Sequence, residues 1–382
     1  MPLTPPVFEP VIDQHDTWLA VNPAQGCPKR CRYCYLEDLG LTAVKPTVLA
    51  TPGETVEQLL AHRYYHPALV LALYTCTDAL ATPVTRAHLT ALLDLLGASS
   101  VRNPVCIITK CAIPDDVVEA IARNRAAGLP ILVYLSYSGL GPDIERGINH
   151  TALRANFPRL HAADIPVIHY WRPALPQNST PEAIEHVMDL ATRYAACTVA
   201  VGTKVKPTAL DQITELWPAL ADPDLDDPRT VDSVWPRPIW DWLHALPDRY
   251  ATHPFFQTNS CALAYVLGRG DRAGVWNTPT CLAANRCPAA QRDRCMHAVP
   301  HREPVKNTEV EQHLAKIGLP GLPFTLHAGA RTLHLGRPVP LRDRHNLAQV
   351  LALTVRAPSD PQETYWQGRL TGARPLIIDP RP

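Results

Sequence analysis

The chain of 382 residues has no apolar run that could cross a membrane, because its best run, Ala68–Leu73, is far shorter than the roughly 18 residues that a spanning helix needs. Its first residues, Met1–Pro6, have neither the basic nor the apolar stretch of a secretion signal. We therefore expect a cytoplasmic protein with reduced thiols. A chain of this length can bury a full core without disulfides.

The chain also lacks a net charge, since 36 lysines and arginines balance 36 aspartates and glutamates. This balance disfavours a protein that only binds nucleic acid. The charges are nevertheless unevenly distributed: residues 1–260 carry 20 basic and 27 acidic side chains, whereas residues 261–382 carry 16 and 9. The last third is therefore the better place for an anionic partner, although arginines that only solvate a surface would give the same excess.

Long helices are not expected, because 40 prolines divide the chain into short segments. In residues 1–206, apolar stretches of strand length alternate with segments of helical spacing, which predicts an α/β fold with a parallel sheet. The predicted strands are residues 18–23, 69–74, 105–109, 131–135, 167–171 and 198–201. The predicted helices are residues 55–65, 86–96, 115–124, 151–163 and 181–194. Six such units suit a partial (β/α)6 barrel with its functional groups at the C-terminal strand ends.

Three cysteines follow the first predicted strand, in the segment Cys27-Pro-Lys-Arg-Cys31-Arg-Tyr-Cys34. Three thiolates at this spacing can bind three irons of a 4Fe-4S cluster and leave the fourth iron open for chemistry. Zinc sites usually consist of two pairs of ligands, so the spacing favours the cluster over zinc.

The CxxxCxxC pattern with Tyr33 before its last cysteine resembles the signature of the radical S-adenosylmethionine (radical SAM) superfamily. The resemblance implies that the open iron binds S-adenosylmethionine and that Tyr33 packs beside this cofactor. It also implies that the cofactor is cleaved reductively to a 5′-deoxyadenosyl radical, which abstracts a substrate hydrogen. An electron donor such as flavodoxin or ferredoxin is then expected.

Short segments around Thr77-Asp78, Ile108-Thr-Lys110 and Arg154 are similar to the spore photoproduct lyase branch of this superfamily, over roughly residues 17–205. The likeness implies contacts from the strand ends to the cofactor's methionine and ribose. The expected contact residues are Thr75, Thr77 and Asp78 for the amino group, Ser136 for the ribose, Arg154 for the carboxylate, and Lys110. Threonine and serine at strand ends can instead satisfy local backbone groups.

Cys76 lies near the position of the cysteine that returns a hydrogen atom to the product radical in that branch. In this chain Asp78 follows Cys76 by two positions instead of three, and a shift of one residue on a strand reverses the face. The alternative role for Cys76 is that of a small buried hydrophobic residue. We expect that role for Cys106, Cys111 and Cys197.

Three further segments are predicted after residue 206. Residues 207–258 are expected to form a proline-stiffened connector whose tryptophans pack onto the barrel. Residues 259–303 contain Cys261, Cys281, Cys287 and Cys295, which predict a second 4Fe-4S cluster or a structural zinc site. Residues 304–382 predict a small α+β module similar to a winged helix, with a helix at 310–317, a hairpin at 324–335 and a helix at 343–355. Its His327, His334 and His345 are expected to be structural or exposed.

These patterns predict a radical SAM enzyme with a nucleotide-containing or other small-molecule substrate. The four C-terminal cysteines are not expected in spore photoproduct lyase, so the likeness does not extend to its DNA-repair reaction. Two alternatives stay open. One is a peptide-modifying radical SAM enzyme whose last module recruits the peptide, and the other is a metal-stabilised protein that binds nucleic acid.

Overall fold

The computed structural model describes residues 5–205, 210–228, 231, 233–245, 248–271, 287–298, 304–329, 331–358 and 375–379. Its centre is an eight-stranded sheet in the order β1-β2-β6-β7-β8-β10-β11-β13. Every neighbouring pair in this sheet is parallel except β1 and β2. The strands are β1 (Ile12–Gln14), β2 (Leu19–Val21), β6 (Leu71–Leu73), β7 (Val105–Thr109), β8 (Ile131–Leu135), β10 (Val167–Ala174), β11 (Cys197–Gly202) and β13 (Phe255–Phe256).

All six predicted strands are present, as β2, β6, β7, β8, β10 and β11, and the α/β fold class is confirmed. Five helices connect them: α1 (Pro52–Ala61), α2 (Pro83–Ala98), α3 (Asp115–Ala126), α4 (His150–Ala162) and α5 (Pro181–Tyr194). The order of these strands in the sheet follows their order in the chain. Because β1 and β13 are edge strands, the sheet is open, as a partial barrel requires.

Three of these helices begin at a Thr-Pro pair. The side chains of Thr51, Thr82 and Thr180 each accept a hydrogen bond from the backbone three residues on, and a proline occupies the next position. Proline suits the first helical turn because no hydrogen bond within the helix is lost there. This cap explains why α1 and α2 begin three residues earlier than predicted. None of the described helices is both long and apolar enough to span a membrane.

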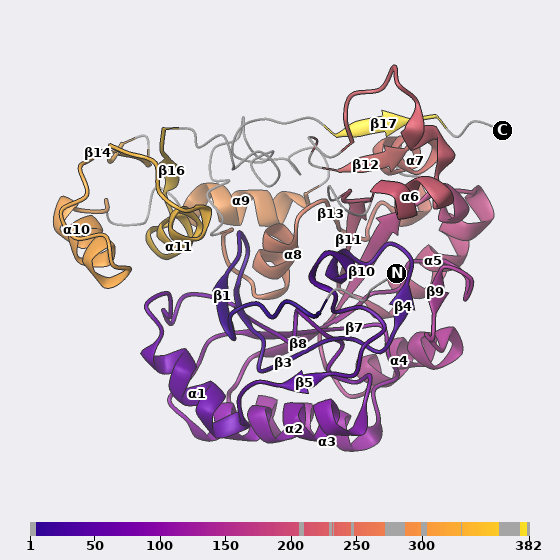
Figure 1. Ribbon diagram of the computed structural model, residues 1–382, viewed down its shortest axis with the longest axis horizontal. Coiled ribbons are helices and arrows are strands. Elements are labelled where there is room, and N and C mark those ends of the chain that lie inside the picture. The colour runs from indigo at the N-terminus through magenta and orange to yellow at the C-terminus, as the bar shows by residue number, and fades with distance from the viewer. Residues whose placement is uncertain are drawn as a thin grey trace.

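The two faces of the sheet are covered by different parts of the chain (Figure 1). Successive strand residues face opposite sides, so Leu71 and Val133 pack under the five connecting helices. Ala72 and Leu132 face the other way and pack with α8 (Asn259–Val266). Helix α8 therefore covers the face that would line the inside of a barrel.

The segment predicted as a connector contains regular structure. It holds α6 (Leu210–Leu216), β12 (Val234–Pro236) and α7 (Arg237–Ala245), and its β13 extends the central sheet. Strand β12 pairs with β17 (Leu376–Ile378). As predicted, a connector tryptophan packs onto the barrel: the Trp242 ring centroid lies 5.8 Å from that of Trp171 on β10.

The C-terminal module comprises α10 (Asn307–Lys316), β14 (Phe324–His327), β15 (Thr332–Leu335), α11 (Leu341–Leu351) and β16 (Thr354–Arg356). The predicted helix 343–355 is too long, because Ala352 has a left-handed backbone and the next residues pair with β15. The module contacts the edge of the main sheet, where Asn346 donates a hydrogen bond of 2.7 Å to Gln14 of β1. His345 is buried, whereas His327 and His334 are exposed, as expected.

Two buried histidines link β10 and β11 to the segment that precedes β13. The hydroxyl of Thr198 lies 3.0 Å from Nδ1 of His169 and 2.8 Å from Nε2 of His253. Burial lowers the pKa of His169 to about 3 and that of His253 to about 4, so both are neutral in the folded chain.

We predict that this arrangement makes the fold sensitive to acid. In the unfolded chain both histidines titrate near pH 6.5, so below that pH the unfolded state binds protons that the folded state does not. The free energy of unfolding should fall by about 2 kcal/mol per histidine between pH 7 and pH 5. Denaturant titrations at both pH values test this. His253→Gln should reduce the difference, and the control His334→Gln, at an exposed position, should not.

Candidate active site

The C-terminal ends of parallel strands meet at one edge of a sheet, and the cysteine loop and the predicted residues at the strand ends gather there. The cysteine loop follows β2 and the short strand β3 (Ala24–Gln25). Thr75 to Asp78 follow β6, Lys110 follows β7 and Ser136 follows β8. A pocket lined by Thr17, Val70 and Gln349 lies at the other, N-terminal edge and contains none of these residues.

Backbone contacts fix the cysteine loop at both ends. Gly26 donates a hydrogen bond of 3.0 Å to the Cys76 carbonyl, and Cys27 donates one of 2.7 Å to the Leu41 carbonyl. Gly26 has φ +100°, and a Cβ there would lie 3.2 Å from the Lys45 carbonyl oxygen, so glycine is required. Further along, β4 (Arg30–Cys31) pairs antiparallel with β9 (Glu145–Arg146).

The three thiols lie in one neighbourhood. Cys27 is buried, and Cys31 and Cys34 are partly exposed. Burial raises the pKa of Cys27 and of Cys31 to about 12, and it also raises that of Cys34. The charges of neighbouring loop thiolates raise the pKa of Cys27 and that of Cys31 further, so the sulfurs lie close enough to interact.

The donor set fits an iron-sulfur cluster better than a single ion. No group of three His, Cys, Asp or Glu side chains within the described ranges stands ready to hold one metal ion. A four-iron cluster spaces its sulfur ligands more widely, because each binds a different iron. Two cations also lie near the thiols, since the charge of Lys110 lowers the pKa of Cys31 and that of Arg172 lowers the pKa of Cys34. Such cations favour the thiolate form that cluster irons need.

The side chains predicted to hold the cofactor's amino group are hydrogen-bonded within the protein. Thr77 donates its hydroxyl hydrogen to the Gly26 carbonyl, and Thr75 donates to Asn22 Oδ1 at 3.1 Å. The carboxylate of Asp78 accepts hydrogen bonds from the Thr109 hydroxyl and from the backbone of Leu80 and Lys110, at 2.7–3.0 Å. These bonds occupy both of its oxygens. A role of Asp78 in cofactor binding stays a prediction, and its observed contacts tie the end of β6 to the end of β7.

The other expected contacts are differently placed. Ser136 is buried, and its carbonyl accepts a hydrogen bond of 3.0 Å from Lys110 Nζ. Arg154 is exposed on α4, and its charge acts on Tyr137, whose pKa burial raises and Arg154 lowers. Cys76 is buried in a small cluster with Cys27, beside the loop. The structure thus brings Ser136, Lys110 and Cys76 to the cysteine loop and leaves Arg154 on the helix surface.

Glu145, which the sequence patterns missed, connects several residues of the site through hydrogen bonds. Its side chain is fully buried, and one oxygen, Oε1, accepts hydrogen bonds from Tyr33, from Lys110 at 2.7 Å and from Ser138 at 2.8 Å. The other oxygen, Oε2, has no hydrogen-bond partner among the described residues and lies 3.6 Å from His150 Nδ1. Its segment shows no helical or alternating pattern, so only its backbone pairing with Cys31 reveals its place.

Arg172 is a second residue that the patterns missed, because the predicted strand ended at Trp171. Its guanidinium lies 5.1 Å from the ring centre of Tyr170 and 5.7 Å from that of Tyr35, and it donates a hydrogen bond of 3.0 Å to the Tyr170 hydroxyl. No carboxylate of the described residues forms an ion pair with it. Asn259, at the start of α8, donates a hydrogen bond of 3.1 Å to the same hydroxyl, and its buried Oδ1 has no hydrogen-bond partner in the described part of the chain.

The C-terminal cysteines are only partly described. Cys261 lies on α8 and Cys295 on α9 (Ala289–Ala298), while Cys281 lies outside the described residues. Cys261 and Cys287 both pack against the core under α8. The sulfur of Cys295 accepts hydrogen bonds from the Asp271 backbone at 3.4 Å and from Gln291 at 3.2 Å. A second cluster or zinc site at these cysteines stays a prediction.

The burial of Glu145 predicts a large effect of its neutralisation. Glu145→Gln leaves Lys110, whose side chain is only 15% exposed, without its negative partner. We expect a loss of about 3 kcal/mol in the free energy of unfolding, since removing one member of a buried ion pair leaves an uncompensated charge. Chemical denaturation measures it. Asp94→Asn is the matched control, because the Asp94–Arg123 pair is about half exposed and should contribute less than about 1 kcal/mol. Equal losses in the two variants would contradict the prediction.

No protein-family model and no curated protein matches the sequence. Among solved structures, the chain is similar to spore photoproduct lyase in complex with dinucleoside spore photoproduct, with a TM-score of 0.43, 14% identity, and 58% of this chain and 66% of that chain covered. It is similar to the radical S-adenosylmethionine methyltransferase TsrM from Kitasatospora setae, with a TM-score of 0.39, 13% identity, and 53% and 39% covered.

A radical SAM methyltransferase from Sphaerobacter thermophilus has a TM-score of 0.38, 15% identity, and 53% and 64% covered. The chain covers less than two thirds of each of these three proteins. These three solved structures are of spore photoproduct lyase and of two radical SAM methyltransferases, and the cysteine loop resembles the signature of the same superfamily.

Proposed function

We propose that the chain is a radical SAM enzyme in which Cys27, Cys31 and Cys34 hold a 4Fe-4S cluster. The observation that carries the proposal is the position of these three thiols on one loop, at the edge where the parallel strands end. When bound, a 4Fe-4S cluster with S-adenosylmethionine on its open iron supplies one-electron reduction and hydrogen abstraction.

The chain's own residues have positioning and electrostatic roles in this proposal. Lys110 and Arg172 place positive charge beside Cys31 and Cys34, which offsets the negative charge that three thiolates bring. Glu145 holds Lys110 and the hydroxyl of Tyr33, so it fixes the orientation of the aromatic ring inside the cysteine motif. Ser136 and Lys110 are the best placed of the expected cofactor contacts, because both lie beside this network.

The metal content of variants tests the cluster assignment. In the variant Cys27→Ala/Cys31→Ala/Cys34→Ala, prepared without oxygen, about four irons should be lost relative to the unmutated chain. If about four irons remain, Cys261, Cys281, Cys287 and Cys295 hold a second cluster. If about one zinc remains instead, they form a structural site.

The matched control is Cys111→Ala, because Cys111 is buried close enough to Cys27 to sense its charge but lies outside the motif. Its iron content should equal that of the unmutated chain. Retention of full iron in the triple variant, or loss of iron in the control alone, contradicts the assignment of the three loop cysteines.

We further propose that the substrate carries an oxyanion, as a nucleotide does, and that Arg172 binds it. The support is a guanidinium in the second half of β10 that has one hydrogen bond to the protein, lies within 5.7 Å of the centres of two aromatic rings and has no described carboxylate in ion-pair contact. Such a cation is well suited to bind a phosphate or carboxylate. The unpartnered Oδ1 of Asn259, beside the same tyrosine, can accept a hydrogen bond from the substrate.

Deoxyadenosine formation with a panel of nucleosides and their 5′-monophosphates tests this substrate class. At least one monophosphate should raise the rate above background, and more than its parent nucleoside does. Arg172→Gln should increase the half-saturating concentration of that monophosphate about tenfold or more, because a charged hydrogen bond is lost. Arg172→Lys keeps the positive charge, so it should increase this half-saturating concentration less than Arg172→Gln does. If no nucleotide raises the rate, the nucleotide class is wrong, while the iron measurements still decide the enzyme class.

A further inference from the structure

Two arginines with like charge face each other directly beside the cysteine loop. In the antiparallel pair of β4 and β9, Arg30 stands opposite Arg146. Directly opposed residues have their Cβ atoms only about 5 Å apart, and like charges at such positions destabilise a sheet. Both side chains are exposed, so the two like charges lie at the protein surface.

Neither arginine is neutralised by a carboxylate in the described part of the chain. Arg146 donates a hydrogen bond to the Asp143 carbonyl, and the neighbouring Lys29 donates one of 2.7 Å to the Gly147 carbonyl. Both contacts are to backbone oxygens, which leave the positive charges in place. By contrast, Arg32 is paired with Glu215 at 2.8 Å. Lys29, Arg30 and Arg146 form a basic surface, which we name the loop surface.

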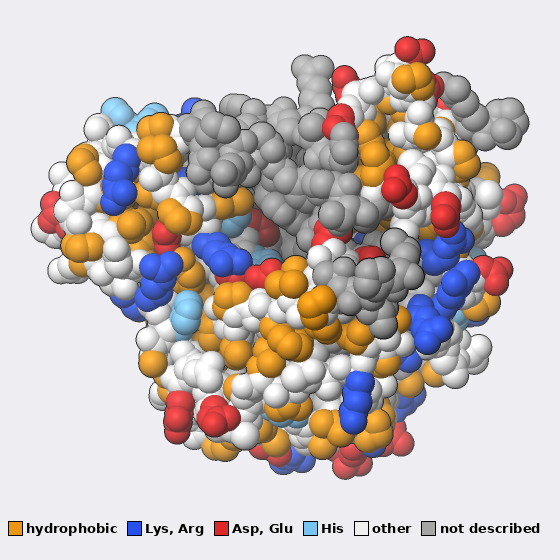
Figure 2. Space-filling model, in the orientation of Figure 1, with side chains coloured by type: hydrophobic (Ala, Val, Ile, Leu, Met, Phe, Trp, Pro, Cys, Tyr) orange, Lys and Arg blue, Asp and Glu red, His pale blue; other side chains and the backbone are white. Residues whose placement is uncertain are grey.

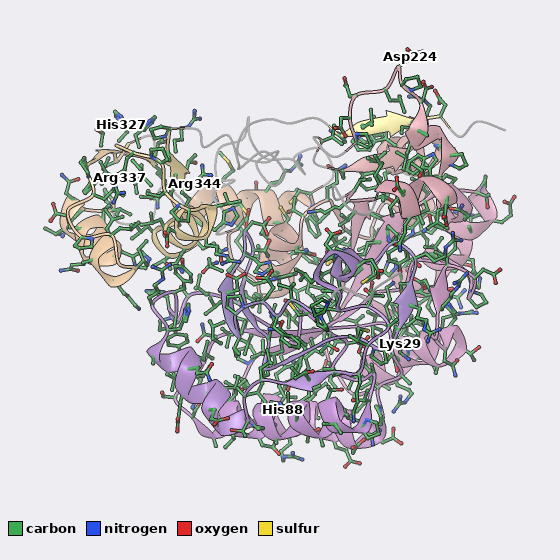
Figure 3. The ribbon with its side chains drawn as sticks, viewed as in Figure 1. Lys29, His88, Asp224, His327, Arg337 and Arg344 are labelled. Carbon is green, nitrogen blue, oxygen red and sulfur yellow. The ribbon has the colours of Figure 1, made fainter. Side chains whose placement is uncertain are left out.

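The loop surface lies on the cysteine loop itself. Lys29 and Arg30 are between Cys27 and Cys31 in the chain, and Arg146 follows Glu145, the hub of the buried network. Basic side chains gather over β4 and β9 in the space-filling view (Figure 2), and Lys29 lies on the same side of the molecule (Figure 3). Any molecule bound there would lie close to the three thiols.

We propose that the loop surface is the docking site of an acidic one-electron donor protein, such as one that carries a reduced flavin. This inference rests on the proposed function, because that function requires a source of single electrons. With a cluster held by Cys27, Cys31 and Cys34, such a partner would supply one electron from its reduced flavin, and no atom would be transferred. Docking beside Cys31 would give that electron a short path.

Charge complementarity favours a protein partner over nucleic acid. Three basic groups are few for binding to a phosphate backbone, and the exposed carboxylates of Glu37 and Asp143 lie in the same segments. In addition, residues 1–260 carry more acidic than basic groups, so the loop surface is a local exception. A folded acidic protein can match such a small patch.

The test uses Arg146→Glu, which replaces the like-charge pair by an opposite-charge pair. Its melting temperature should be equal to or higher than that of the unmutated chain, because the repulsion is relieved. Its dissociation constant for an acidic flavodoxin, measured by calorimetry at low salt on both cluster-free and iron-loaded protein, should rise about tenfold or more. The control is Arg337→Glu, an exposed arginine of the C-terminal module far from Lys29 (Figure 3), which should bind as the unmutated chain does.

Activity gives a second measurement. Deoxyadenosine formation supported by flavodoxin should fall in Arg146→Glu, while formation supported by dithionite, which needs no docking site, should not change. Arg30→Glu/Arg146→Glu should bind flavodoxin more weakly still. A melting temperature or iron content lowered in Arg146→Glu would assign the arginine a structural role and overturn the proposal.

Equal flavodoxin affinity in Arg146→Glu and the control would also overturn it. So would a tighter, equally charge-dependent binding of single-stranded oligothymidylate, since the surface would then be a nucleic-acid site. If neither reductant yields deoxyadenosine in the unmutated chain, the proposed function fails, and the calorimetric comparison still decides the docking surface.

Discussion

The cysteine loop depends on one buried carboxylate. Glu145 holds Tyr33, Lys110 and Ser138 through a single oxygen, and its backbone lies opposite Cys31. A fully buried carboxylate is costly unless its charge is compensated and its oxygens accept hydrogen bonds. This constraint ties two strand ends to the loop, because Lys110 follows β7 and Ser138 follows β8, while Tyr33 lies inside the cysteine motif.

The site also has a consistent charge arrangement. Asp78 and Glu145 lie close enough to Cys27 and Cys31, respectively, to raise the pKa of each thiol, while Lys110 acts in the opposite direction on Cys31. Three thiolates would add negative charge at a place that already holds two carboxylates. Lys110 and Arg172 place positive charge beside Cys31 and Cys34, which offsets part of this negative charge, and the loop surface adds further positive charge on the outside.

The regular part of this structure could be predicted from the sequence, and the site only in part. Strands such as Val105–Thr109 and Ile131–Leu135 are continuous apolar runs, which determine both their type and their ends. The cysteine motif is visible because its chemistry requires a fixed spacing. Glu145 and Arg172 were missed since their roles arise from long-range pairing: β9 has two residues, and β10 continues past the apolar stretch. Sequence spacing carries no signal for such contacts.

The packing of α8 determines where a substrate can meet the site. The inward-facing residues Ala72, Cys106 and Leu132 are almost fully buried, and they are packed together with Ala262 and Leu263 of α8. Within the described residues, the interior of the sheet is thus filled with side chains. In the proposed function, a substrate would therefore approach at the C-terminal edge, between the cysteine loop, Arg172 and the start of α8. Because Asn259 begins that helix and contacts Tyr170, a shift of α8 would move the unpartnered amide oxygen and the aromatic wall together. Helix α8, which covers this face of the sheet, would therefore also help to determine the geometry of the proposed substrate site.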